Sequence, residues 1–140
     1  MKRVFRALVF VLTLAIVVPS IQILGPSVAV AQTEKKLASA LKKAQAAYDN
    51  IELEKAEKLL RDGIALAEKE EMQGEVVGQL HIMLGILLFA STGEEGPTED
   101  AFVAGLTADA AGDLPDVYRT PVLEDILNRA RDKIPGDSNN

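Results

Sequence analysis

A long stretch without a formal charge constrains the fold of this 140-residue chain more than any other feature. It covers residues 76–93, and its segment 80–90 is apolar almost all round. A helix of this kind lies either in the centre of a helix bundle or in a membrane. The dense segment is about half the roughly twenty residues that a membrane span requires. We therefore expect a central helix over about residues 74–91.

The segments around this helix carry amphipathic helical patterns. Residues 33–48 place apolar side chains at i, i+3, i+4 and i+7, with Thr33 as a suitable N-cap. Asp49 and Glu52 resemble a capping pair for a second helix that runs to residue 69. Two further helices are expected, from Pro97 to about residue 112 and from Thr120 to about residue 134. No stretch shows strand alternation, so the sequence predicts an all-α fold.

The N-terminus has the pattern of a signal peptide. A basic start is followed by an apolar core over residues 7–18 and by the small-residue site Ala29-Val30-Ala31. The pattern predicts cleavage between Ala31 and Gln32, with export to the periplasm or secretion. The expected organisation is a signal peptide (1–31), a helical domain (32–134) and a disordered tail (135–140). The alternative is an uncleaved membrane anchor, because residues 21–24 and 28–30 prolong the apolar run.

The charge and the composition exclude several classes of function. The whole chain carries a net charge of −6, and no lysine or arginine lies between Lys69 and Arg119. This acidic half disfavours nucleic acid and anionic membrane surfaces as partners. The absence of cysteine removes disulfides, thiolate nucleophiles and zinc sites built on sulfur.

The residues that enzymes use are scarce in this chain. His81 is the single histidine and shares a helical face with Val77, Leu84 and Leu88, so we expect a packed core side chain. No serine lies in a nucleophile turn, and no glycine-rich phosphate loop is present. The aspartates of residues 109–116 lack the ligand order of a calcium loop. The expectation is a non-enzymatic protein with no catalytic residue, no cofactor and no metal site.

An internal repeat links the two halves of the helical region. Ala44 corresponds to Gly85 and Gly63 to Gly105, at nearly equal spacing. Within each half a small residue is followed by a large one, Leu60 or Phe102, and then by glycine with an aliphatic residue.

This pattern resembles the tetratricopeptide repeat, a helix hairpin with small residues at the helix crossing. Leu84-Gly85, Ala56 and Phe102 match positions of that family, whereas its Trp position holds Ala40 and His81 and its Pro position holds Glu68 and Ala110. The resemblance covers about residues 37–109. It implies two antiparallel helix hairpins that stack as a short right-handed solenoid, closed by a C-terminal capping helix.

The resemblance also implies a function, that of an exported module or adaptor that binds a peptide or a partner helix in a concave groove. The groove would be formed by the first helix of each hairpin, and its expected lining is Leu41, Gln45, Tyr48, Gln79, Ile82, Ile86 and Phe89. Alternatively the last helix folds back over these residues and buries them. Two other functions remain open, namely a self-associating structural protein of the cell envelope and a membrane-tethered accessory protein with an uncleaved leader.

The signal-peptide pattern can be tested directly. Expression in a Gram-negative host should yield protein whose N-terminus is Gln32, because the small side chains of Ala29 and Ala31 fit a signal-peptidase site. Intact-mass analysis of the periplasmic fraction measures this. Full-length protein held in the membrane fraction would favour the uncleaved anchor instead.

Overall fold

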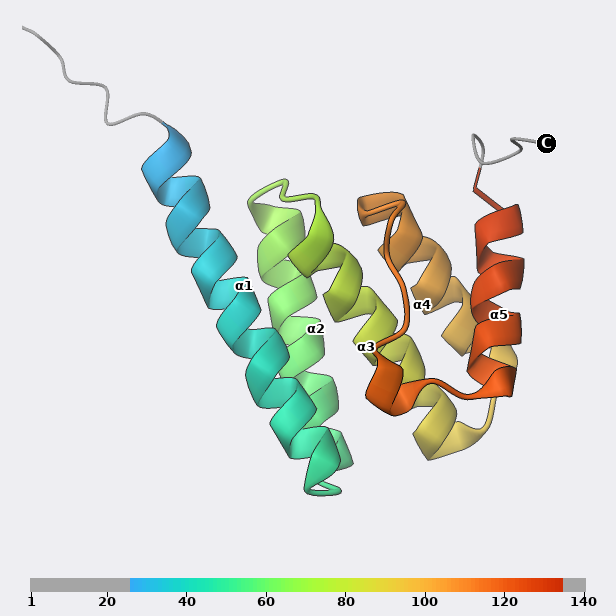
Figure 1. Cartoon of the computed structure of the whole chain (residues 1–140). Helices are drawn as coiled ribbons and strands as arrows, with labels where there is room; N and C mark the ends of the chain where they lie inside the picture. The colour runs from blue at the N-terminus through green and yellow to red at the C-terminus, as the bar shows by residue number, and fades with distance from the viewer. Residues whose placement is uncertain (1–25, 135–140) are drawn as a thin grey trace, which may run out of the picture.

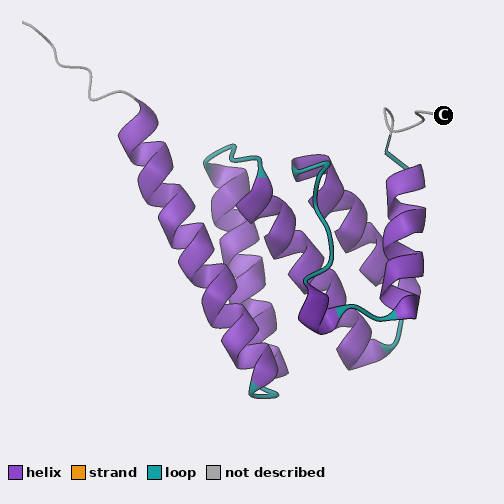
Figure 2. Ribbon diagram, in the orientation of Figure 1, coloured by secondary structure: helices purple, strands orange, loops and turns teal. Residues whose placement is uncertain are grey.

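A computed structural model describes residues 26–134 of the chain, and within that range it contains helices and no strand (Figure 2). The all-α prediction is therefore confirmed for these residues. The elements are α1 (Pro26–Asp49), α2 (Leu53–Lys69), α3 (Glu75–Thr92), α4 (Glu95–Ala108), the short 3-10 helix η1 (Asp116–Tyr118) and α5 (Pro121–Asp132). The leader's basic start and apolar core, and the tail 135–140, lie outside the described residues.

The helices form two antiparallel pairs followed by a fifth helix (Figure 1). α1 packs against α2, α3 packs against α4, and α3 also contacts both helices of the first pair. α5 packs beside α4 and runs in the same direction, because residues 109–120 first return along the molecule (Figure 1). We call residues 109–120 the return segment.

Helix α3, which is uncharged after Glu75, supplies the largest part of the core. Alone among the described helices, it is long and apolar enough to span a membrane by length and composition. Half of the residues in that apolar window are nevertheless buried inside the protein. Its central position between α1, α2 and α4 explains why the stretch carries no charge, since a charged side chain there would lose its hydration without a partner. The buried residues of α3 are Val77, Gly78, Leu80, Ile82, Met83, Leu84, Gly85, Ile86 and Leu87.

Glycines allow α3 and α4 to approach closely. A Cβ atom at Gly85 would lie 2.6 Å from Cε1 of Phe102, and one at Gly105 would lie 2.9 Å from the carbonyl oxygen of Gly78. Both distances are shorter than van der Waals contact, so any side chain at Gly85 or Gly105 would push the two helices apart.

α5 is held against α4 by apolar burial and by ion pairs. Leu123, Ile126, Leu127 and Ala130 are buried. Arg129 Nη2 lies 2.6 Å from Glu95 Oε2 and its Nε lies 3.2 Å from Glu99 Oε2, while Lys133 pairs with the same Glu99 carboxylate. These cations hold the pKa of Glu99 below its ordinary value.

Some helix boundaries differ from the sequence-based expectation. α1 begins at Pro26 rather than at Thr33, because no residue between them interrupts a helix. Asp49 and Glu52 do not act as a capping pair, since Asp49 is the last residue of α1 and the Glu52 side chain makes no cap hydrogen bond. α4 ends earlier than expected, at Ala108, where Asp109 turns to an extended conformation. The predicted start of α5 is confirmed, and Thr120 caps it by accepting a hydrogen bond from the Leu123 amide.

The close contact of α3 and α4 predicts that a methyl group at Gly85 destabilises the protein, whereas one at Gly96, outside this contact, does not. Gly85→Ala should lower the free energy of unfolding by about 1–3 kcal/mol, because its Cβ overlaps the Phe102 ring. The matched control is Gly96→Ala, where no atom lies within 4 Å of the new Cβ and the helix should gain up to about 1 kcal/mol. Urea titration measures both changes. Equal stability of the two variants would contradict the glycine contact.

Candidate functional site

Three of the predicted groove residues, Tyr48, Ile86 and Phe89, line one hollow, and the seven differ in their burial. Leu41, Gln45 and Tyr48 are half-buried on α1, while Gln79 and Phe89 are half-buried on α3. Ile82 and Ile86 are buried in the core. Two of the four residues in the stripe proposed for α3 are therefore core residues, although Ile86 still lines that hollow.

The return segment covers the part of the groove near the start of α3. Gln79 Nε2 donates a hydrogen bond of 3.2 Å to the carbonyl oxygen of Asp113. Gly112 approaches so closely that its Cβ position lies 3.0 Å from Cδ1 of Ile82, and Leu114 is buried. The return segment therefore lies against this part of the stripe, as the chain travels back along α3 before α5 begins (Figure 1).

Two arginines fix the return segment in place. Arg119 Nη2 lies 2.7 Å from Asp113 Oδ2, and Arg131 Nη2 lies 3.3 Å from Asp113 Oδ1. Both guanidinium groups also donate to backbone carbonyl oxygens, those of Leu114 and Gly112. The hydrogen bond from Arg119 is the main cause that lowers the pKa of Asp113. Asp113 is therefore a structural partner of arginines rather than a free calcium ligand.

An aromatic pair ties the end of the return segment to the end of α1. The rings of Tyr48 and Tyr118 meet edge to face, with centroids 5.2 Å apart. The Tyr118 hydroxyl donates a hydrogen bond of 2.8 Å to Asp49 Oδ1. Burial, this hydrogen bond and the Asp49 charge raise the pKa of Tyr118 to about 12.

A hollow of about 270 Å³ remains open beside this pair, and we call it the tyrosine hollow. Three predicted groove residues line it, together with residues of the return segment and of α5. Its lining is Tyr48, Ile86, Phe89, Ala90, Val117, Tyr118, Thr120 and Leu123.

Two large apolar side chains lie exposed near the tyrosine hollow. Val117 lines it and is 82% exposed. Ile51, in the turn just beyond Tyr48, is 83% exposed and has a φ of 63°. That left-handed conformation is unfavourable for a β-branched residue. The hollow and these side chains together can accept an apolar side chain from another molecule.

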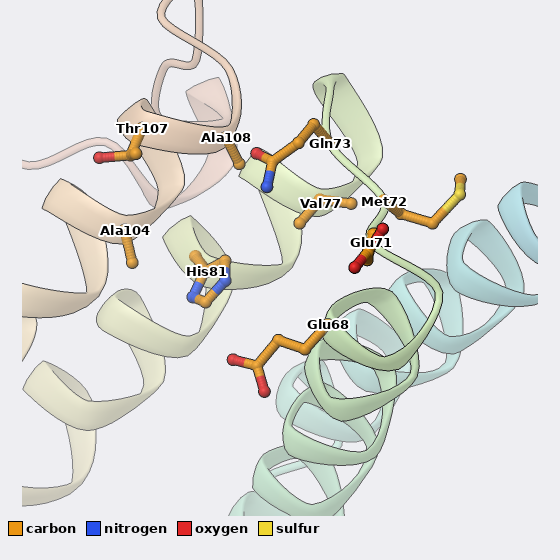
Figure 3. Close-up of a pocket in the computed structure, with 9 residues that line it drawn as sticks. All are labelled: Glu68, Glu71, Met72, Gln73, Val77, His81, Ala104, Thr107 and Ala108. Atoms are coloured by element: carbon orange, nitrogen blue, oxygen red, sulfur yellow. The ribbon is translucent and has the colours of Figure 1, made fainter.

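A second hollow, of about 480 Å³, was not expected from the sequence. It lies between the end of α2, the first half of α3 and the end of α4, with His81 among the lining residues (Figure 3). His81 is half-buried there rather than packed in the core. Burial lowers its pKa, and the nearby charge of Glu68 opposes that shift only in part. No periodicity could have revealed this hollow, because it combines a turn with three helices.

In the part of the chain that the structure describes, no three His, Cys, Asp or Glu side chains are placed to hold a metal ion together. His81 makes no side-chain hydrogen bond within residues 28–134. What both hollows offer is an apolar surface with acidic neighbours.

Comparisons with known proteins do not assign the chain to a family. No protein-family model matches the sequence, and neither a curated protein nor a solved structure matches it at a significant level. The function must therefore be argued from the residues and their geometry.

The raised pKa of Tyr118 predicts a pH dependence. A phenol whose pKa rises on folding, from 10.0 to about 12, adds stability that is fully present below pH 10 and is lost as the pH rises toward 12. Tyr118→Phe should make the decline of stability over this range shallower than in the wild type. Chemical denaturation at each pH measures the effect, and absorbance titration can follow the phenols because the chain has two tyrosines and no tryptophan.

The control for this test is Asp49→Asn, which keeps both rings and removes the charge. It should lower the pKa of Tyr118 toward 10. If Tyr118 titrates near 10 in the wild-type protein, the contact between α1 and the return segment does not form in solution.

Proposed function

We propose that this chain is a non-enzymatic interaction module that binds a peptide or helix of a partner protein at the tyrosine hollow. The observation that supports the proposal is Val117, which is 82% exposed and lines an apolar hollow shared with Phe89 and Ile86. An exposed apolar side chain that adjoins such a hollow is typical of an interaction site.

The resemblance to a helical repeat supports the same proposal. The Cβ position of Gly63 lies 3.5 Å from Cβ of Ala40, and the Cβ position of Gly105 lies 3.3 Å from Cβ of His81. These are corresponding residues in the two halves of the sequence. Equivalent contacts at equivalent positions favour two related hairpins. The resemblance then implies that they stack as a short right-handed solenoid, with α5 as the capping helix.

The return segment restricts where a partner can bind. It occupies the groove at Gln79 and Ile82, so we infer that a partner contacts only the end near Tyr48 and Phe89. A partner therefore needs one or two apolar anchor side chains rather than a long extended segment.

The surroundings of the hollow favour a basic partner. Asp49 is exposed beside the tyrosine pair, and the Asp116 side chain in η1 is 97% exposed. No lysine or arginine lies between Lys69 and Arg119 in the sequence. Lysine or arginine residues beside the apolar anchor would speed association, and salt would weaken that effect.

Export remains part of the proposal. Ala31 and Gln32 are both exposed in α1, and Leu37 is the first buried side chain among the described residues. Cleavage between Ala31 and Gln32 would therefore remove no buried contact of the described domain. The proposed location is the periplasm, with secretion as the alternative.

Self-association is the second candidate function. Ile51 and Val117 are exposed apolar side chains near the same end of α1, and two copies could bury them against each other. A third possibility, a membrane-tethered accessory role, applies if the leader is retained.

A peptide array tests the partner-binding proposal. The mature protein is applied to peptides that carry a central Phe, Leu or Ile flanked by Lys and Arg or, for comparison, by Glu. Peptides with basic flanks should bind, and binding should weaken as salt is raised. Val117→Glu should reduce binding at least ten-fold, because it places a charge in the apolar site without changing a buried residue.

The matched control is Val122→Glu, an exposed valine of α5 that does not line the hollow. It should bind peptides as the wild type does. Equal loss in both variants would contradict a specific site. A concentration-dependent dimer in sedimentation equilibrium that Val117→Glu dissolves, with no peptide binding, would favour self-association.

A further inference from the structure

The hollow around His81 is separate from the tyrosine hollow. His81 lies near the start of α3, whereas Phe89 lies near its other end. The hollow is formed where the α2–α3 turn and the last turn of α4 meet the start of α3. The amide of Gly74 donates a hydrogen bond of 3.0 Å to the carbonyl oxygen of Ala108, which joins the turn to α4.

The floor and the rim of the hollow differ in character. Val77 is buried in the floor, and Met72 and Ala108 are half-buried beside it. Glu68 and Glu71 line the hollow as exposed carboxylates, and Figure 3 shows the Glu68 side chain extending toward the space below His81. Among the described residues neither carboxylate forms an ion pair.

The imidazole adds a neutral acceptor between the apolar floor and the acidic rim. Desolvation lowers the pKa of His81 from 6.5, so the ring is uncharged at pH 7 and one ring nitrogen can accept a hydrogen bond. A ligand that matches the hollow has an aliphatic stem and a cationic N–H group at its end.

We propose that this hollow binds a primary alkylammonium group, with its stem on Val77 and its ammonium between Glu68, Glu71 and His81. Such a group occurs in free aliphatic diamines and in lysine side chains. The ammonium would donate hydrogen bonds to both carboxylates and to the imidazole, while its methylenes would leave water for the apolar floor. The negative charge of this half of the chain attracts the cation from a distance.

Because His81 is the single histidine of the chain, its NMR signal needs no separate assignment. The Cε1–H signal of His81 is observed by NMR during titration with 1,5-diaminopentane or with a capped lysine, and 1,5-pentanediol serves as an uncharged analogue. Both amines should shift the signal saturably, and bound amine should lower the pKa of His81 because it places a positive charge beside the ring. The diol should produce no saturable shift. Tighter binding of one amine identifies the source, a free diamine or a lysine side chain.

Three variants that each remove one negative charge distinguish a specific site from general electrostatic attraction. Glu68→Gln and Glu71→Gln should each weaken amine binding about two- to five-fold, the effect of losing one exposed ion pair. Glu70→Gln removes the same charge from a neighbouring residue that does not line the hollow, and it should leave affinity unchanged. Equal weakening in all three variants, or a shift that never saturates, would overturn the proposal. Val117→Glu should not alter amine binding, so this result is independent of the tyrosine hollow.

Discussion

The close approach of α3 and α4 is the contact on which the rest of the structure depends. Gly78, Gly85 and Gly105 leave no space for side chains between the two helices. α4 packs so closely on α3 that the chain still contacts α3 where α4 ends. Asp109 Cβ lies 2.8 Å from the Cβ position of Gly78. The return segment then follows the surface of α3 instead of extending into solvent. The covered groove is therefore a consequence of helix spacing.

The return segment competes with any partner for the same surface. A segment of the same chain has a high effective concentration, so it occupies its part of the groove more readily than a free peptide can. Arg119 and Arg131 add to this advantage by pairing with Asp113. Under the proposed function, only the surface beside Tyr48 and Tyr118 is left for a second molecule.

The distribution of charge places acidic side chains beside both hollows. The bases that follow Asp113 in sequence are largely engaged within the protein, Arg119 and Arg131 with Asp113, and Arg129 with Glu95 and Glu99. Among the described residues, Glu68 and Glu71 beside the His81 hollow form no ion pair, whereas Asp116 beside the tyrosine hollow pairs with Arg119 and is still 97% exposed. Both proposed ligands, a lysine-like stem in one hollow and an apolar anchor with basic neighbours in the other, match apolar surface with acidic borders.

The sequence by itself determined the all-α class, the central position of α3 and the start of α5 at Thr120-Pro121, because periodicity, charge and proline placement are local properties. It also indicated that Gly85 lies at a close crossing. It did not reveal that residues 109–120 cover Ile82, or that Glu68 and Glu71 border His81. Those arrangements depend on the path of a turn and a loop between packed helices, and only tertiary contacts between residues distant in sequence decide that path.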